Sequence, residues 1–124
     1  MKKKYTETHE WVRGDSEQTA LVGISNYARQ ELGEIVYVEM PKVGSLIEQG
    51  EQVSVLESTK AAADIYSPVS GKIIGINNIL NKDLQPLNQQ PEEEGWLFKI
   101  EISKKEELDH LLDEESYKHL IKNV

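Results

Sequence analysis

The chain has 124 residues, no cysteine and a formal net charge of −8 at pH 7. That length is enough for one domain, residues 1–124, with its own apolar core, and the absence of cysteine excludes disulfides, thiolate nucleophiles and cysteine-ligated metal centres. The acidic balance argues against a nucleic acid partner, because phosphate binding requires basic residues. No apolar run reaches the roughly 20 residues of a membrane span, and polar residues follow the basic start instead of an apolar signal core. We therefore expect no membrane contact and a cytoplasmic location.

The first third of the chain predicts two strands followed by a short helix. β-Branched and aromatic residues predict strands over residues 5–12 and 19–24. Ser25 is placed to be the N-cap of a helix over residues 26–32, and Gly33 to be the left-handed residue that ends it.

The middle of the chain alternates short apolar runs with residues that break strands. Strand-like runs occupy residues 35–40, 53–56 and 73–76. The breakers around them are Pro41, Gly44, Gly50, Pro68 and Gly71. Short strands punctuated in this way favour a mainly β fold, a small barrel or sandwich over about residues 5–102. The Pro-x-x-Gly spacing occurs twice, which hints at two similar halves.

The last fifth of the chain changes to a helical pattern. Ser103 and Glu106 have the spacing of a capping box, and leucines follow at helical intervals. Asp113 is placed to cap a second short helix that carries Tyr117 on its apolar face. We expect these C-terminal helices, over about residues 103–122, to pack on the β-rich part of the chain.

Most of the negative charge lies in one segment. Between Glu92 and Glu115 there are ten acidic residues and three lysines, so this fifth of the chain carries nearly the whole net charge. Such a surface steers docking to basic patches on a partner. It is equally consistent with a solvated face that only aids solubility. The sequence leaves both interpretations open.

Lys60 lies between two strand-like runs and among small residues. Residues 53–56 precede it and Ile65-Tyr66 follows it, which predicts a hairpin with the lysine near its tip. Its neighbours are Ser58, Thr59, Ala61 and Ala62. Nothing bulky crowds the amine, although an exposed lysine is ordinarily no more than a solvated charge.

The sequence lacks the motifs of common enzyme classes. It has no Gly-x-Ser-x-Gly elbow, no phosphate-binding glycine-rich loop and no Gly-x-Gly-x-x-Gly fingerprint. The histidines, His9, His110 and His119, do not have the spacing of metal ligands. We therefore expect no catalytic residue and no metal site. A folded β domain that presents a lysine suits a carrier.

Separated segments of the chain carry a family resemblance. They are His9-Glu10-Trp11-Val12, Val22-Gly23-Ile24-Ser25, Leu32-Gly33-Glu34-Ile35, Pro41-Lys42-Val43-Gly44, the stretch from Glu57 to Gly71, and Gly95-Trp96-Leu97-Phe98. Together, and in this order, they resemble the glycine cleavage H-protein family of lipoyl carriers. The resemblance implies a flattened lipoyl-type β-barrel or sandwich with internal two-fold similarity, a short early helix and C-terminal helices. It also implies lipoic acid attached to Lys60.

The same resemblance implies a carrier protein, not an enzyme, that moves the aminomethyl group of glycine on its lipoyl-lysine arm. The implied partners are glycine decarboxylase, aminomethyltransferase, dihydrolipoyl dehydrogenase and a lipoyl ligase or transferase. The dithiol chemistry would come from the cofactor, since the chain has no cysteine. In this family acidic residues hold the amine of the loaded arm, and the matching positions are Glu10 and Asp64. We expect a monomer.

Three alternatives remain open. A biotin carrier normally has methionines beside its lysine, whereas here the flanks are Thr59 and Ala61. A lipoate reservoir that relays its group to 2-oxo acid dehydrogenases needs the same lysine. A non-carrier adaptor of the same fold agrees poorly with the intact Lys60 segment. Glu31 and Glu92 depart from the family pattern, which leaves the lining of the arm cleft and the partner surface open.

Overall fold

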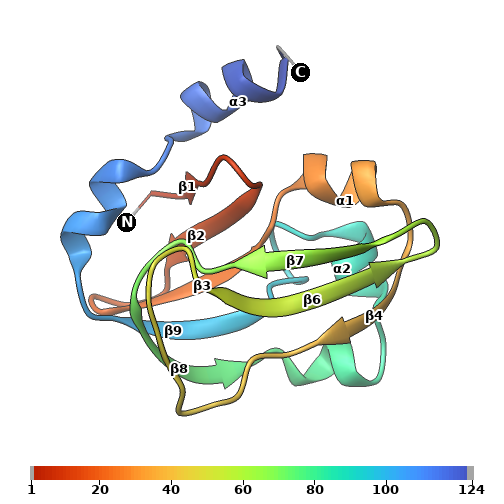
Figure 1. Ribbon diagram of the computed structural model, residues 1–124, viewed down its shortest axis with the longest axis horizontal. Coiled ribbons are helices and arrows are strands. Elements are labelled where there is room, and N and C mark those ends of the chain that lie inside the picture. The colour runs from red at the N-terminus through yellow and green to blue at the C-terminus, as the bar shows by residue number, and fades with distance from the viewer. Residues whose placement is uncertain (1, 123–124) are drawn as a thin grey trace.

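The computed structural model describes residues 2–122, which form two antiparallel β-sheets (Figure 1). The larger sheet has the strand order β1-β2-β3-β9-β8-β5. Its strands are β1 (Lys4–Tyr5), β2 (Glu10–Gly14), β3 (Thr19–Ile24), β9 (Phe98–Ile102), β8 (Gly71–Ile76) and β5 (Leu46–Ile47). The smaller sheet, in the order β4-β6-β7, consists of β4 (Ile35–Glu39), β6 (Gln52–Ser58) and β7 (Ala62–Tyr66). The predicted mainly β fold is confirmed, as a sandwich and not as a closed barrel in this part of the chain.

One apolar core lies between the two sheets. The larger sheet contributes Val22 and Ile100, and the smaller sheet contributes Ile35, Leu56 and Ile65. Each of these side chains is at most 4% exposed. Burial of this apolar surface is the main force that holds the sheets together. Because side chains alternate along a strand, some neighbours of the buried residues point to solvent, as Glu57 does beside Leu56 and Glu101 beside Ile100.

The predicted strand over residues 5–12 is wrong, because the chain turns back on itself within it. Thr6 N–H donates to the Glu10 carbonyl (2.9 Å) and His9 N–H to the Thr6 carbonyl (3.2 Å). Tyr5 in β1 then pairs with Trp11 in β2. The turn contains neither glycine nor proline, and His9 itself adopts the positive φ of 78°. The usual sequence markers of a turn are therefore missing.

Helix α1 (Asn26–Leu32) begins as predicted and ends differently. The Ser25 hydroxyl accepts a hydrogen bond from Ala28 N–H at 3.1 Å, so the N-cap is confirmed. Gly33 does end the helix, and its N–H donates to the Arg29 carbonyl. Its φ of 86° and ψ of −166° are not left-handed helical values, however. Gly33 lies in an extended region with positive φ that is open essentially to glycine alone.

The predicted capping box at Ser103 and Glu106 is wrong. The segment forms a 3₁₀ helix, η2 (Lys105–His110), whose first turn has no side-chain cap. Glu107 explains the difference, because its carboxylate accepts hydrogen bonds from the N–H (2.7 Å) and the hydroxyl (2.8 Å) of Ser70. This tertiary contact holds the segment against the sandwich and overrides the local helical pattern.

The cap predicted at Asp113 is confirmed. Its carboxylate accepts a hydrogen bond from Ser116 N–H at 2.8 Å, at the start of α3 (Glu114–Lys122). Tyr117 is buried, as its place on the apolar stripe predicted. Its ring stacks on Tyr5 with the two centroids 4.2 Å apart, so α3 packs beside β1.

Two short helices between β8 and β9 were not predicted. They are η1 (Asn78–Asn81) and α2 (Gln85–Gln89), which bury Leu80 and Leu87. Each helix has only four or five residues, too short for a helical period to show in the sequence. No helix among residues 2–122 has the length and apolar character needed to cross a membrane.

Candidate functional site

Lys60 lies at the tip of the hairpin that joins β6 to β7, at the edge of the molecule (Figure 1). The strands pair as far as Glu57 opposite Ala62, so the turn is short. The Ser58 hydroxyl accepts hydrogen bonds from the backbone N–H groups of Lys60 and Ala61, each at 3.1 Å. Ser58 N–H also donates to the Ala61 carbonyl at 2.8 Å. The backbone of the turn is thus held, while the Lys60 side chain is exposed.

A further hydrogen bond joins the turn to the end of α1. Thr59 N–H donates to the Glu34 carbonyl at 3.0 Å. Thr59, Ala61 and Ala62 are small and exposed, so solvent and partners can approach the lysine from several directions. The predicted hairpin around Lys60 is therefore confirmed, and Thr59 leaves it intact.

Glu10, predicted to contact the arm, lies in the interior with no exposed surface. One of its carboxylate oxygens accepts hydrogen bonds from the hydroxyls of Thr6 and Thr8, and the other accepts one from Tyr66 N–H at 3.1 Å. Burial raises the pKa of Glu10, against the opposing effect of these hydrogen bonds. Because Glu10 begins β2 and Tyr66 ends β7, the carboxylate links the two sheets.

Asp64, the other predicted arm contact, is exposed on β7. Its carboxylate accepts a hydrogen bond from the side-chain amide of Gln52 on the neighbouring strand, at 3.1 Å. Within residues 2–122, no hydrogen bond or ion pair joins Lys60, Glu10 and Asp64 to one another. The two acids therefore occupy different environments, one inside the sandwich and one on the surface of the hairpin.

A polar cluster that the sequence analysis missed joins α3 to the start of α1. The Tyr117 hydroxyl lies 2.7 Å from the ring nitrogen Nδ1 of His9 and 2.6 Å from the hydroxyl of Ser25. Burial lowers the pKa of His9, and the exposed Glu31 nearby opposes that shift. Burial also raises the pKa of Tyr117 to about 12. From the sequence, Tyr117 was expected only to fill the core. No sequence pattern predicts which groups bond to its hydroxyl.

Glu92, which the sequence presents as one acid of a charged run, is an internal anchor and not a free surface acid. Its carboxylate accepts hydrogen bonds from the Tyr5 hydroxyl (2.6 Å) and from the backbone N–H of Asn26 (2.8 Å). The Lys3 ammonium lies 3.2 Å from the same carboxylate. Burial, together with Glu92, raises the pKa of Tyr5. Glu92 thus ties β1 to the first residue of α1.

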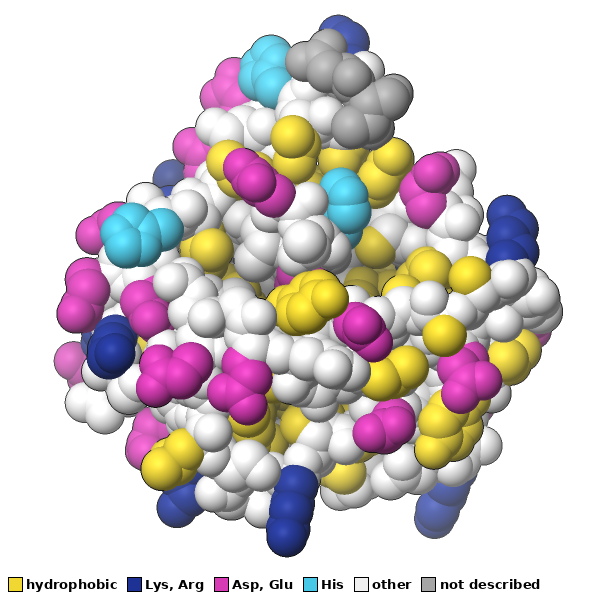
Figure 2. All heavy atoms as spheres, in the orientation of Figure 1, with side chains coloured by type: hydrophobic (Ala, Val, Ile, Leu, Met, Phe, Trp, Pro, Cys, Tyr) yellow, Lys and Arg dark blue, Asp and Glu magenta, His cyan; other side chains and the backbone are white. Residues whose placement is uncertain are grey.

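Some acids of the segment from Glu92 to Glu115 are bonded within the protein, and others are exposed. Glu92 and Glu107 are engaged inside the protein, and Glu93 forms an ion pair with Arg13 at 3.1 Å. Other acids of the segment are exposed, among them Glu106, Asp109 and Glu115. Figure 2 shows acidic side chains gathered along the left flank of the molecule, where η2 runs in Figure 1. Part of the segment is therefore available to a partner.

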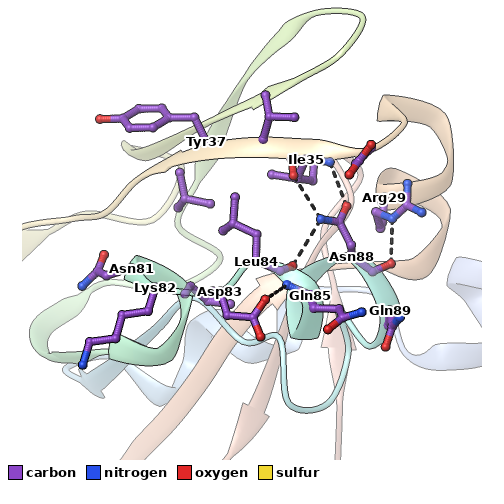
Figure 3. A pocket seen from close by; sticks show the side chains of 14 residues that line it. Arg29, Ile35, Tyr37, Asn81, Lys82, Asp83, Leu84, Gln85, Asn88 and Gln89 are labelled. Carbon is purple, nitrogen blue, oxygen red and sulfur yellow. Dashed lines mark hydrogen bonds between the residues drawn. The ribbon is translucent and has the colours of Figure 1, made fainter.

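A pocket lies between β4 and the pair η1 and α2, and none of the three predicted residues lines it (Figure 3). Its volume is about 950 Å³. The side-chain amide of Asn88 crosses one end, where it accepts a hydrogen bond from Ile35 N–H (2.8 Å) and donates to the Ile35 carbonyl (3.0 Å). Arg29 Nε donates to the Asn88 carbonyl at 2.8 Å. No group of His, Asp or Glu side chains suited to a metal ion occurs within residues 2–122.

Comparison with known proteins gives one consistent result. The family model described as "Glycine cleavage H-protein" matches residues 3–124. A glycine cleavage system H protein of Thermotoga maritima is 52% identical over 93% of this chain and 92% of that protein. One from Coxiella burnetii is 44% identical over 94% and 90%. The crystal structure of a glycine cleavage system H protein from Mycobacterium marinum superposes with a TM-score of 0.87 at 29% identity, over 97% of this chain and 96% of that one.

Proposed function

The chain belongs to the glycine cleavage H-protein family, and from this we propose that Lys60 carries the lipoyl group of this carrier. Proteins of this family are carriers and not catalysts. The observation that supports the assignment to Lys60 is its place at the tip of the β6–β7 hairpin, exposed among small residues on a hydrogen-bonded turn. Lipoic acid would be attached by an amide bond to Nζ. Within residues 2–122, Lys60 Nζ has no hydrogen bond or ion pair that attachment would break.

In the proposed function, the lipoyl group supplies the reactive chemistry, and the protein supplies attachment and presentation. When attached, a lipoyl group would supply a disulfide that accepts the aminomethyl group, and the dithiol left after transfer of that group would be reoxidised to the disulfide. Lys60 provides the amine for attachment, and conversion to an amide removes its positive charge. The turn around Ser58 presents the lysine to one partner after another. Attachment to a docked carrier makes each encounter of the group with an active site effectively intramolecular.

The proposed partners are glycine decarboxylase, aminomethyltransferase, dihydrolipoyl dehydrogenase and the lipoyl ligase or transferase that modifies Lys60. The family assignment supports the first three, since the relatives are named for the glycine cleavage system. A cytoplasmic location and a monomeric state belong to the same proposal. The absence of cysteine fits a reducing compartment.

Asp64 and Glu10 remain proposed contacts of the loaded arm, and the structure supports them unequally. Asp64 is exposed and lies four residues from Lys60 along the hairpin. Among residues 2–122, its side chain forms a hydrogen bond only with the Gln52 amide. This carboxylate would accept a charge-assisted hydrogen bond from the protonated amine of the arm without any rearrangement of the fold. Glu10 already has hydrogen-bond partners on both oxygens, so the arm would have to displace the hydroxyl of Thr6 or Thr8. That assignment stays a prediction.

The test of the proposed function is the site and effect of lipoylation. After incubation of the purified protein with a lipoyl ligase, lipoate and ATP, intact mass should show one added lipoyl group, and peptide mapping should place it on Lys60. Lys60→Arg should accept none, whereas the matched control Lys72→Arg, at an exposed lysine on β8, should be lipoylated normally. Lipoylated Lys60→Arg would refute the assignment. Glycine-dependent release of carbon dioxide with glycine decarboxylase should then require the wild-type lysine. If the lipoylated wild-type protein supports no such release, a lipoate relay is favoured.

A further inference from the structure

The Lys60 side chain lies over the bare backbone of Gly33. A Cβ atom built at residue 33 would be 3.4 Å from Lys60 Cε, 3.6 Å from Cδ and 3.6 Å from the Thr59 hydroxyl oxygen. The φ of 86° and ψ of −166° at this position belong to a region that only glycine enters without strain. Residue 33 therefore combines a glycine-only conformation with a surface on which the methylene stem of the lysine rests.

The hairpin turn is also bonded to the residue that follows Gly33. The Thr59 N–H to Glu34 carbonyl bond (3.0 Å) joins the turn to residues 33–34, which we name the α1–β4 corner. The corner is itself held, because the Ser25 cap and Glu92 secure the start of the seven-residue helix that leads to it. The lysine stem thus meets a supported backbone and not a mobile loop.

We propose that the α1–β4 corner is a positioning element for Lys60, and that the lipoyl-attaching enzyme recognises the hairpin tip and the corner as one surface. The inference rests on the proposed function of Lys60. A lysine stem has four rotatable bonds, and the closeness of its Cδ and Cε atoms to residue 33 limits the positions that Nζ can take. An alanine Cβ at residue 33 would meet the stem only at ordinary van der Waals distance, but alanine is strained in this backbone conformation. The corner would therefore shift, and the turn bonded to Glu34 and the Lys60 amine would be displaced with it. Displacement of a reacting atom by about 1 Å is enough to slow an enzymatic transfer by one to two orders of magnitude.

The test compares two glycines that share positive φ and differ in surroundings. Gly50, with a φ of 84°, has nothing within 4 Å of its position for a Cβ, so Gly50→Ala imposes backbone strain without touching Lys60. Relative to Gly50→Ala, Gly33→Ala should lower kcat/KM for lipoylation of Lys60 by about tenfold. Acetylation of Lys60 by a small reagent, followed by mass spectrometry, should proceed at the wild-type rate in both variants. Equal lipoylation of the two variants would overturn the proposal.

A second measurement covers the case in which Gly33→Ala does not fold. In the wild-type protein, the Thr59 amide should exchange its hydrogen at least tenfold more slowly than an unstructured amide, because it is bonded to Glu34. Free exchange at Thr59 would show that the turn does not rest on the corner. The outcomes separate the two hypotheses. If the wild-type protein takes no lipoyl group on Lys60, the proposed function fails as well; if it does and the corner tests fail, only the corner is refuted.

Discussion

At the scale of single residues, Glu10 shows how burial changes the structural role of a carboxylate. The sequence presents it as an acid in a polar stretch, yet its side chain is completely buried between the two sheets. It is tolerated there because both oxygens accept hydrogen bonds, which offset the cost of removing a charge from water. The raised pKa shows that this compensation is incomplete.

Replacement of Glu10 should therefore have a pH-dependent effect on stability. Because its folded-state pKa is raised by burial, the stability that the carboxyl contributes is present below its usual value of 4.5 and is lost as pH rises through the raised pKa. In urea unfolding, Glu10→Gln should lose less stability at pH 8 than at pH 5, relative to the wild type. Glu10→Ala should lose about 2–3 kcal/mol at pH 5, because it leaves Tyr66 N–H without a partner, and by the same linkage it should lose less at pH 8. An identical cost of Glu10→Gln at both pH values would contradict this account.

At the scale of elements, the short helix α1 depends on contacts from outside itself. A helix of seven residues is not stable alone. Its first turn is satisfied by Ser25, which the sequence predicts, and by Glu92, which comes from 66 residues further along the chain. The Tyr117 hydroxyl adds a link from α3 to the same cap.

Glu92 should accordingly matter for stability in a way that its acidic neighbours do not. Glu92→Gln should lower the free energy of unfolding by about 1–3 kcal/mol, because it weakens the hydrogen bonds to Tyr5 and Asn26 and the ion pair with Lys3. The matched control is Glu94→Gln, at an exposed acid two residues away, which should change stability by less than about 0.5 kcal/mol. Chemical denaturation at neutral pH gives both values. Equal effects would mean that Glu92 behaves as a surface charge.

At the scale of the whole molecule, the charge distribution bears on how the carrier meets its partners. Nearly all of the net charge comes from the segment between Glu92 and Glu115. The structure removes Glu92 and Glu107 from the set of free acids, because both are bonded internally. Any steering must therefore come from the acids of the segment that stay exposed, among them Glu106, Asp109 and Glu115.

Association with the partner enzymes should slow as salt concentration rises, because exposed charges are screened. A triple variant that replaces Glu106, Asp109 and Glu115 by their amides should reduce the association rate at low salt and flatten its salt dependence. The control replaces three exposed acids outside the segment, Glu7, Glu17 and Glu39, and should keep most of the salt dependence. Stopped-flow measurement of binding to glycine decarboxylase provides the rates. Equal salt dependence in both triple variants would leave the acidic segment with a role in solubility only.

Features that depend on neighbours in the sequence were determined by the sequence itself. The caps at Ser25 and Asp113 bond to residues three positions ahead, and the hairpin around Lys60 follows from two β-rich runs and a small-residue turn. The mainly β fold follows in the same way, because the alternation of apolar residues is a local property of each strand. The family resemblance adds the proposed role of Lys60 to this local pattern.

Only the tertiary structure decided the features that join distant parts of the chain. Glu10 bonds to Tyr66 across 56 residues, Glu92 to Asn26 across 66, and Glu107 to Ser70 across 37. Each of these acids resembles a surface residue in the sequence, because nothing beside it shows which backbone groups the fold will bring to it. The contact of the Lys60 stem with Gly33 is of the same kind. Spacing along the chain determines local hydrogen bonds where no tertiary contact competes, as the contact of Glu107 with Ser70 does beside the predicted capping box. Burial of apolar surface between the two sheets determines which distant groups meet.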